Sequence, residues 1–377
     1  MSSILFITLI VVFIIIQSKL YKNGLFEKVY ISRSFDNTGV FPGDKVVYEF
    51  AIENRKFLPM TWVSIDEKLN FGLEFENSTK IHPLNEEIYS HTSVLSVLPY
   101  QKIVRRYNLM AVKRGFYQLR SLEMTSTNLL GTEEYIIEKE AYASIVVYPK
   151  LRDLRGALVP ANTTQGDFSI KRWIIEDPMV ITGVRSYSGN DSLKSINWKA
   201  TAKNQKLLVN KYDFTADKKI MIILNLERHE YTLTKEYIHI IESSIEVCAS
   251  IAAMLHDLGV PVGFATNSHI LGAIETNVLD PDTGDKHMTA ILESLGKVSY
   301  FKKYKSRELL KLMVASFSWG TEVMVVTPEI SIELLEDLQS LNSIRTTVIS
   351  VSKSDVNVPS NIDLYYYKQE GEHYEAI

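Results

Sequence analysis

Residues 219–224 read KIMIIL, and residues 236–259 read EYIHIIESSIEVCASIAAMLHDLG. The first stretch is apolar almost throughout, as expected of a parallel strand that is covered on both faces. In the second, apolar residues recur at helical spacing, and Gly259 stands where a helix would end. The only cysteine, Cys248, falls on the apolar face, so we interpret it as a core residue and not as a nucleophile. A buried strand followed by a long amphipathic helix is typical of an α/β fold.

The same alternation continues toward the C-terminus. We expect strands over residues 261–265, 322–326 and 346–351, and helices over residues 287–295, 306–317 and 331–341. Residues 364–367 add a last strand, at the edge of the sheet, before a polar tail. The pattern predicts a doubly wound α/β domain over residues 215–377.

Upstream of this region, apolar and polar residues alternate in short runs. The clearest runs are KVYISR (28–33), KVVYEFAIEN (45–54), TWVSIDEKL (61–69) and YASIVVYP (142–149). Such alternation is strand periodicity, and turn-forming residues separate the runs. A single sheet would leave its apolar face in water, so we predict two sheets packed face to face. This all-β part is a β-sandwich over residues 27–150, and a linker over residues 151–214 joins it to the α/β domain.

The chain begins with a continuous apolar run, ILFITLIVVFIII, over residues 4–16. With its flanking residues the run approaches the ~17 residues that a membrane span needs at the least, so we predict a transmembrane anchor over residues 1–22. A signal peptide is the alternative. No Lys or Arg precedes the run and no small-residue cleavage site follows it, which favours a retained anchor.

The positive charges nearest the anchor all follow it: Lys19, Lys22, Lys28 and Arg33. By the positive-inside rule this arrangement places the N-terminus outside and the body of the protein in the cytoplasm. A chain with one cysteine also fits a reducing compartment. We therefore expect a single-pass protein of the cell membrane.

Composition and motifs exclude several classes of function. With 41 basic and 45 acidic side chains the net charge is −4, which argues against a protein whose main task is binding nucleic acid. We find no phosphate-binding loop, no G-x-S-x-G elbow, no H-E-x-x-H and no paired cysteines. We therefore predict a protein that is not an enzyme, has no cofactor and binds no metal.

The most distinctive stretch, residues 182–211, reads TGVRSYSGNDSLKSINWKATAKNQKLLVNK. It resembles the signature of the bacterial family catalogued as domain of unknown function 58, roughly R-x-Y-x-x-G-D-x-x-R-x-I-[DH]-W-x-x-x-A-R. The matching residues are Arg185, Tyr187, Asp191, Ile196, Trp198 and Ala202. The departures are Asn190 for Gly, Lys194 and Lys203 for Arg, and Asn197 for Asp or His. The order of a sandwich followed by an α/β region also resembles the family, so the resemblance covers most of the chain after residue 27.

Read by itself, the stretch predicts a turn at Gly189 and Asn190 and a helix over residues 192–203 that Asp191 caps. In one interpretation Tyr187 and Trp198 fill the seam between the two domains while Arg185 pairs with Asp191. In the other, the stretch is an interaction site whose lysines meet an acidic surface. A solvated, charged helix face is the simpler explanation of these lysines and the one we favour. Those lysines are Lys194, Lys199, Lys203, Lys206 and Lys211. The candidate interaction residues are Arg185, Tyr187, Asp191, Lys194, Trp198 and Lys203.

The predicted α/β domain resembles a von Willebrand factor type A domain. Such domains often hold a divalent metal on a D-x-S-x-S motif after the first strand, and Asn225, Glu227 and His229 stand at the matching positions. A later Thr-Asp-Gly appears here as Thr327-Pro328-Glu329, and proline cannot ligate a metal. The resemblance therefore implies a degenerate site without a metal, and the alternative is that Glu227, His229 and Glu329 converge in another arrangement. We expect these residues, Asn225, Glu227, His229, Thr327 and Glu329, to line a mouth that docks a partner.

The family resemblance implies a MoxR-type AAA+ ATPase as partner. We therefore expect a membrane-anchored scaffold or adaptor that acts in chaperone-like assembly or envelope maintenance, with other membrane or envelope proteins as further partners. The alternative is an extracytoplasmic protein that binds an envelope polymer or acts in adhesion, which requires the opposite orientation of the anchor. A hydrolase with an unrecognised site is a third class, and it would need Asp191 or Glu227 for turnover.

Overall fold

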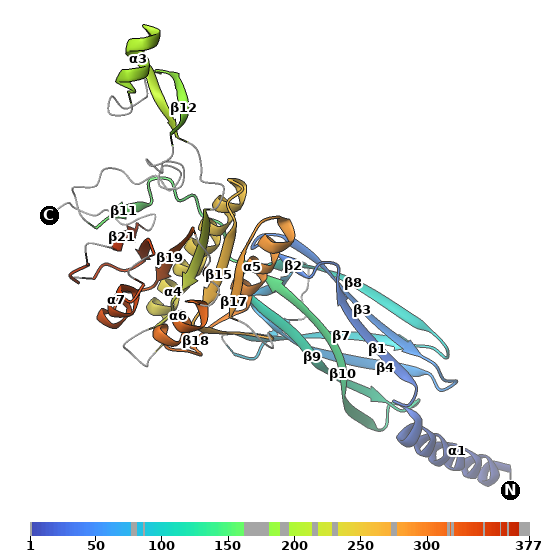
Figure 1. Ribbon diagram of the computed structural model, residues 1–377. Coiled ribbons are helices and arrows are strands. Elements are labelled where there is room, and N and C mark those ends of the chain that lie inside the picture. The colour runs from blue at the N-terminus through green and yellow to red at the C-terminus, as the bar shows by residue number, and fades with distance from the viewer. Residues whose placement is uncertain are drawn as a thin grey trace. The chain divides into compact units, whose positions relative to one another are not determined.

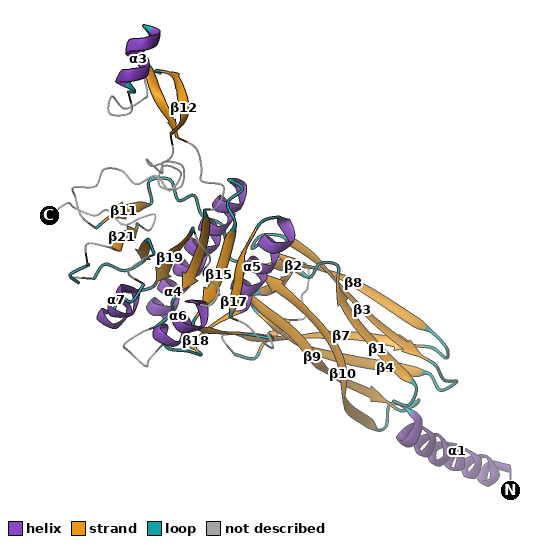
Figure 2. Cartoon of the chain, in the orientation of Figure 1, coloured by secondary structure: helices purple, strands orange, loops and turns teal. Residues whose placement is uncertain are grey.

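The protein divides into two compact units, Met1–Lys150 and Leu151–Ile377, in a computed structural model of the chain (Figure 1). The structure describes residues 2–76, 81–85, 87–161, 181–188, 196–212, 218–227, 233–272, 277–314, 317, 320–341, 344–354, 356–359 and 362–368. Each unit has an apolar core of its own. The first unit is rich in strands, and the second alternates strands with helices (Figure 2).

The N-terminal unit begins with one helix, α1 (Ser2–Gly24), and continues as antiparallel strands. The strands are β1 (Val29–Phe35), β2 (Gly39–Val40), β3 (Lys45–Asn54), β4 (Met60–Asn70), β5 (Leu73–Phe75), β6 (Ile81–Pro83), β7 (Ile88–Val97), β8 (Lys102–Ala111), β9 (Gly115–Thr127) and β10 (Glu134–Val147). They form two sheets, with orders β1-β3-β8-β5 and β2-β10-β9-β4-β7-β6. Among the described strands of this unit, only the short pairing of β2 with β10 is parallel.

The two sheets bury their inner faces against each other, as the alternating pattern predicts. Tyr48 and Phe50 of β3 share one core with Ile65 of β4 and Met124 of β9. The predicted strand over residues 45–54 is confirmed residue for residue as β3. The run at residues 142–149 is the second half of the longer strand β10. A β-rich, sandwich-like N-terminal part is therefore confirmed.

Helix α1 is long and apolar enough to cross a membrane, and the same properties fit a signal sequence. Its apolar residues before Gln17 are exposed, whereas Tyr21 and Leu25 are buried in the core of the sandwich. The Ser18 hydroxyl donates to Glu133 Oε2 at 2.7 Å, and the Tyr21 hydroxyl donates to the carbonyl oxygen of Pro59 at 3.1 Å. The last turns of α1 are thus part of the sandwich.

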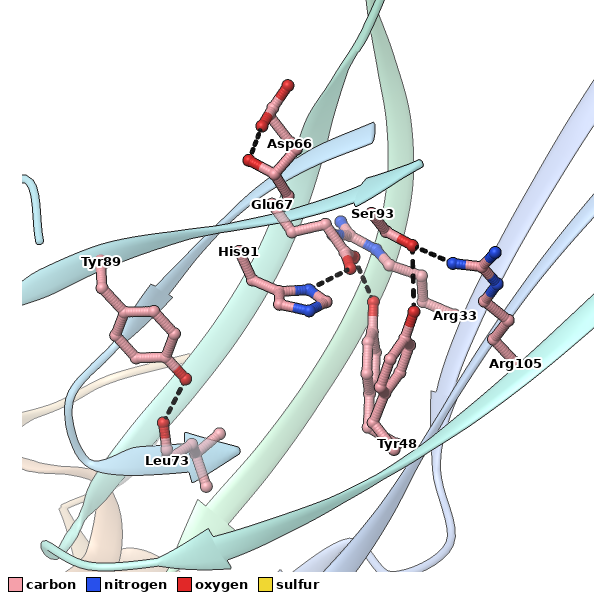
Figure 3. Close-up of polar contacts among 11 residues, drawn as sticks. Arg33, Tyr48, Asp66, Glu67, Leu73, Tyr89, His91, Ser93 and Arg105 are labelled. Carbon is pink, nitrogen blue, oxygen red and sulfur yellow. Dashed lines mark hydrogen bonds and ion pairs between the residues drawn. The ribbon is translucent and has the colours of Figure 1, made fainter. Parts of the chain in front are cut away.

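A charged network lies inside the sandwich and joins its two sheets (Figure 3). Arg33 Nη1 of β1 donates to Glu67 Oε1 of β4 at 3.2 Å, and both side chains are almost completely buried. Arg33 Nε also donates to the Ala141 carbonyl oxygen at 2.8 Å, and the Tyr48 hydroxyl donates to Glu67 Oε1. Burial, followed by the charge of Glu67, raises the pKa of Tyr48, so its hydroxyl stays a donor. A buried charge needs such partners, because desolvation otherwise makes it costly.

Further polar residues surround this ion pair. The Nδ1 atom of His91 on β7 lies 3.9 Å from Glu67 Oε2, and its ring stacks on Phe75 with centroids 4.1 Å apart. Arg105 Nη1 of β8 donates to the Ser93 hydroxyl of β7 at 2.6 Å, again from one sheet to the other. The network therefore connects both sheets at more than one point along the strands.

The burial of Arg33 corrects one step of the orientation argument. Arg33 was counted among the positive charges that follow the apolar run, but its guanidinium is paired with Glu67 inside the sandwich. It cannot act as a charge beside a membrane. Lys19, Lys22 and Lys28 remain, and all three are exposed.

The C-terminal unit contains the predicted α/β alternation. Its elements are β11 (Leu158–Pro160), β12 (Ile181–Ser186), α3 (Trp198–Asn204), β13 (Leu208–Tyr212), β14 (Lys219–Leu224), α4 (Lys235–Asp257), β15 (Val262–Thr266), β16 (Ser268–Ile270), β17 (Val278–Asp282), α5 (Asp285–Lys297), β18 (Val298–Lys302), α6 (Ser306–Val314), β19 (Thr321–Thr327), α7 (Ile332–Gln339), β20 (Thr346–Ser350) and β21 (Ile362–Tyr367). The main sheet has the order β11-β21-β20-β19-β14-β15-β17. Its inner strands are parallel, and β11 and β17 pair antiparallel at its two edges.

Helices cover both faces of this sheet. On one face, Met221 and Ile223 of β14 share a core with residues of α6 and α7 such as Leu309 and Leu334. Neighbouring residues such as Ile222 point to the opposite face, where α4 packs against β14 and β19 and lies beside α5. Helix α4 ends at Asp257, and Gly259 follows with φ +72°, a conformation that glycine adopts without strain. Cys248 is buried on α4, and burial raises the pKa of its thiol, which keeps it protonated.

One prediction about this sheet is wrong. Residues 364–367 were expected to form an edge strand, but β21 lies between β20 and β11. Leu158 pairs with Tyr367 and Pro160 with Tyr365. Strand β11 comes from the stretch that was assigned to the linker, and it is too short for the alternation of side chains to reveal it.

Replacing Glu67 by Gln should leave the Arg33 charge buried without a counter-charge and destabilise the sandwich. Breaking a buried ion pair in this way costs about 3–5 kcal/mol. The exposed pair of Arg106 with Glu49, 2.9 Å apart, provides the matched control, and Glu49→Gln should cost less than about 1 kcal/mol. Urea unfolding of the full-length protein in detergent micelles, followed by proteolysis of the sandwich, measures both changes. Equal midpoints for the two variants would contradict a special role of the buried pair.

Candidate functional site

Polar side chains meet at the carboxyl ends of β14 and β15, where they contact the first residue of α6. Asn225 follows β14, Asn267 follows β15, and all of Asn225, Asn267 and Ser306 are buried. Ligands of open α/β sheets collect at this edge, because the loops that follow parallel strands meet there. We call the group formed by Asn225, Glu227, Asn267, Lys302 and Ser306 the mouth cluster.

Asn267 holds the two loops of the mouth cluster together. Its Nδ2 atom donates to Asn225 Oδ1 at 2.6 Å, and its Oδ1 atom accepts from the backbone N–H of Leu226 at 2.8 Å. Its carbonyl oxygen accepts from the N–H of Lys303 at 2.7 Å. One buried amide side chain and its own backbone thereby fix three chain segments at the edge of the sheet.

Glu227 is the charged centre of the mouth cluster. Its Oε2 atom accepts from the backbone N–H of Ser306 at 3.0 Å and from the Ser306 hydroxyl. The same hydroxyl lies 2.9 Å from Asn225 Oδ1, and its single proton serves one of these acceptors at a time. Lys302 Nζ lies 3.6 Å from Glu227 Oε1. Glu227 thus caps the N-terminus of α6, where a negative charge is favourable.

These contacts decide the ionisation of Glu227. Burial opposes its ionised form, but the hydrogen bonds from Ser306 and the charge of Lys302 outweigh burial and hold the pKa below its usual value. On α7, burial raises the pKa of Asp337, and the charge of Glu227 acts in the same direction while Arg307 opposes it. The carboxylate of Glu227 is therefore ionised at neutral pH and already balanced by groups of the protein.

The structure brings some of the predicted mouth residues together. Asn225 and Glu227 share Ser306, and the Asn225 N–H donates to the carbonyl oxygen of Val326, next to Thr327. The Thr327 hydroxyl donates to the carbonyl oxygen of Glu329 at 2.8 Å, while the Glu329 side chain is exposed. His229 lies outside the described residues. Within the described ranges, no group of three or more His, Cys, Asp or Glu side chains is arranged to hold a metal ion.

Sequence reasoning missed Asn267, Lys302 and Ser306. Residue 306 was correctly placed at the start of a helix, and a serine there is a common N-terminal signal. What the spacing could not show is that the start of this helix faces the end of β14. Asn267 carried a weaker signal, since a polar residue directly after an apolar strand often closes a loop.

The distinctive stretch folds as a small module of a hairpin and a helix. Strands β12 and β13 pair antiparallel, with Arg185 opposite Val209, and Ile196 forms an isolated bridge with the same Val209. The backbone N–H of Asn197 donates to the carbonyl oxygen of Leu208 at 2.9 Å, which fixes the start of α3 against β13. Ile196 and Val209 are buried and form the small interior of this module.

The predicted helix over residues 192–203 is wrong at its start. Helix α3 begins at Trp198, and the Asn197 side chain caps it by accepting from the Ala200 N–H at 2.9 Å. Residue 196 is held in the bridge to β13 and cannot be helical. Asn197 had been noted only as a departure from Asp or His, yet Asn and Asp cap helices about equally well.

The candidate interaction residues of this module divide into three groups. Arg185 and Lys203 are exposed, and Arg185 Nη1 donates to the carbonyl oxygen of Ser186 at 3.3 Å. Tyr187 is half-buried and Trp198 is 68% exposed. Asp191 and Lys194 lie outside the described residues, as does the predicted turn at residues 189–190. That Tyr187 and Trp198 fill a seam between domains stays a prediction.

Residues 183–360 match the family model described as "Protein of unknown function DUF58". This match supports the DUF58 family for the chain. The DUF58 match begins inside β12 and includes the signature stretch and the mouth cluster, so the resemblance read from residues 182–211 is supported. The sandwich and α1 lie outside the matched range. No curated protein matches the chain.

Among solved structures, the chain is similar to cohesin modules. One is a non-cellulosomal cohesin from Archaeoglobus fulgidus, with 10% identity over 31% of this chain and 90% of that chain and a TM-score of 0.22. Another is a type II cohesin domain from the cellulosome of Acetivibrio cellulolyticus, with 14% identity over 30% of this chain and 94% of that chain and a TM-score of 0.24. Likenesses with such low TM-scores carry no argument about this protein.

Replacing Glu227 by Gln should remove a pH-dependent contribution to the stability of the C-terminal unit. Because the folded-state pKa of Glu227 is lowered from 4.5, its contribution is present above that pH and is lost as the pH falls through the folded pKa. We expect the unfolding midpoint of the wild type to drop on acidification in this range, and the drop to be smaller in Glu227→Gln. The exposed Glu329→Gln is the control. If the unfolding midpoint of Glu227→Gln depended on pH as strongly as that of the wild type, the contribution assigned to Glu227 would be wrong.

Proposed function

We propose that this protein is a membrane-anchored, non-enzymatic scaffold or adaptor whose C-terminal unit docks a partner protein at the mouth cluster. The observation that carries the proposal is the state of Glu227, whose carboxylate is engaged by Ser306 and Lys302. The negative charge of Glu227, which a divalent cation would otherwise balance, is therefore balanced by groups of the same chain. The mouth cluster, fixed by these hydrogen bonds, then forms a rigid surface on which a partner can dock.

In this proposal the C-terminal unit is a von Willebrand factor type A-like domain with a degenerate metal site. The order of the main sheet supports this, because β14, the first strand of the alternation, lies in the middle of the sheet with later strands on both sides. Two exposed apolar residues lie close in the chain to residues at this edge of the sheet. Phe301 precedes Lys302, and Ile332 begins α7 just after the end of β19. Exposed apolar side chains beside fixed polar groups are typical of protein interfaces.

The partner we propose is a MoxR-type AAA+ ATPase, in a role in chaperone-like assembly or envelope maintenance. The family resemblance supports the choice of partner. In the same proposal α1 is a retained membrane span, and the exposed Lys19, Lys22 and Lys28 after its apolar run favour a cytoplasmic body.

Crosslinking and affinity capture of the tagged, full-length protein from native membranes, followed by mass spectrometry, tests the partner. We expect an AAA+ ATPase with the wild type and its loss with the double variant Glu227→Ala, His229→Ala. Phe301→Ser should weaken capture without touching the hydrogen bonds of the mouth cluster. Asp282→Ala is the matched control, because the exposed Asp282 pairs with Val262 at the other end of β15. Equal capture by all variants would contradict docking at this mouth.

A second candidate function is an extracytoplasmic protein that binds an envelope polymer or acts in adhesion. The observation that favours it is the burial of Arg33, which leaves fewer charges in support of a cytoplasmic body. Protease added to sealed cells separates the two candidates. We expect a C-terminal tag to stay protected until the cells are lysed, because the positive-inside rule places the body in the cytoplasm. Digestion of the tag in sealed cells would contradict a cytoplasmic body and support the alternative.

A further inference from the structure

The end of the sandwich that receives α1 is built from three loops. They are the β3–β4 loop (residues 55–59), the β7–β8 loop (98–101) and the β9–β10 loop (128–133), and we call them together the basal end. Registers such as Met60 with Val97 place these loops at one end of the strands. The Tyr100 N–H donates to the carbonyl oxygen of Lys56 at 3.3 Å, so the first two loops touch.

Each loop of the basal end exposes large apolar side chains. Phe57 is 79% exposed, Leu98 58% and Tyr100 71%, and Leu129 and Leu130 of the third loop are also exposed. The side chains on these loops lie at the tips of the sandwich, where solvent-facing turns are ordinarily polar. Five such residues at one end form a larger apolar surface than scattered exposed residues would.

Further exposed apolar residues lie just inside the strands that start at the basal end. Tyr30 is the second residue of β1, Trp62 and Val104 are the third residues of β4 and β8, and Ile136 is the third residue of β10. Tyr and Trp are enriched where a protein meets the boundary between lipid and water. Apolar residues at the loop tips, followed by aromatic residues on the adjoining strands, are the arrangement expected of a surface that enters the membrane interface.

The short free part of α1 also favours such a surface. From Gln17 onward α1 is tied to the sandwich, so only its apolar stretch from Ile4 to Ile16 extends freely. At ~1.5 Å per residue this stretch covers about 20 Å, which is shorter than the ~30 Å of hydrocarbon in a typical bilayer. Because Tyr21 and Leu25 are fixed in the core of the sandwich, a spanning α1 brings the loops of the basal end to the membrane surface.

Charge at the basal end is mixed. The exposed Lys22, Lys28, Arg55 and Lys102 lie near the exposed Glu27, Glu133 and Glu134, and the half-buried Lys56 lies in the same loop as Arg55, which pairs with Glu53. Such a mixture gives no strong preference for an acidic surface, and the apolar side chains then supply the attraction.

We infer that the basal end is a membrane-contact surface, whose loop tips with Phe57, Leu98, Tyr100 and Leu129 insert into the interfacial region of the bilayer beside α1. The occupant is the lipid surface, because α1 leads the chain from this end into the bilayer. The inference rests on the proposed role of α1 as a membrane anchor. The sandwich is then attached to the membrane both by α1 and by the loops of the basal end, which together set its orientation.

Depth-sensitive spin labels on the full-length protein in phosphatidylcholine vesicles test this surface. The native Cys248 is buried, and Cys248→Ala gives a background without cysteine. Labels are attached at Phe57→Cys, Leu98→Cys and Leu129→Cys, one in each loop. Lys113→Cys is the matched control, since exposed Lys113 lies in the β8–β9 turn at the opposite end of the sandwich. We expect collisions with oxygen to be favoured over collisions with a water-soluble nickel complex at all three basal sites, and the reverse at residue 113.

Alkaline carbonate extraction of the same vesicles separates this inference from the proposed anchor. Protein that resists extraction and has lipid-exposed basal labels supports both. Protein that resists extraction while its basal labels are as accessible to nickel as residue 113 keeps the anchor and overturns the membrane-contact surface. Protein that carbonate releases overturns the anchor and the inference with it.

Discussion

The buried ion pair between Arg33 and Glu67 is the constraint on which the N-terminal unit depends. It joins β1 of one sheet to β4 of the other, and neither charge can be left alone in the core without a large desolvation cost. In this packing of the two sheets Arg33 reaches both Glu67 and the carbonyl oxygen of Ala141. A sliding of one sheet over the other would separate this pair and leave both charges buried without partners. The position of α1 follows, because Tyr21 and Leu25 pack into the same core.

Most of the fold was predictable because its elements are long and periodic. Strand β3 and helix α4 were found with their ends nearly correct, and Gly259 marked the end of α4 through its backbone freedom. The failures have physical reasons. The short strand β11 contains too few residues to alternate, and its pairing with β21 joins segments that are distant in the sequence. Arg33 was misread because a charge normally indicates exposure, and burial depends on the partner, Glu67, which comes from another strand.

The site was predictable only in part. Asn225 and Glu227 were named through the resemblance to a von Willebrand factor type A domain, which aligns them with the metal motif that follows the first strand. Their partners Asn267, Lys302 and Ser306 come from other segments, and no spacing connects them with β14. In the signature stretch, Asn197 replaces Asp or His and keeps a capping function that is visible only once Ala200 is seen to donate to it. Site residues that follow one strand could be predicted from the sequence, and site residues that are neighbours only in space could not.

The position of the two chain ends in the sandwich has a mechanical consequence. The chain enters β1 at the end where α1 lies and leaves β10 at Val147, at the other end of the strands. A force applied between α1 and Lys150 therefore acts along the strands and loads their perpendicular backbone hydrogen bonds in shear, many at the same time. Pulling both ends from the same side would instead open such bonds one after another. A load between a tether at α1 and whatever follows residue 150 would therefore be shared by many hydrogen bonds of the sandwich at once.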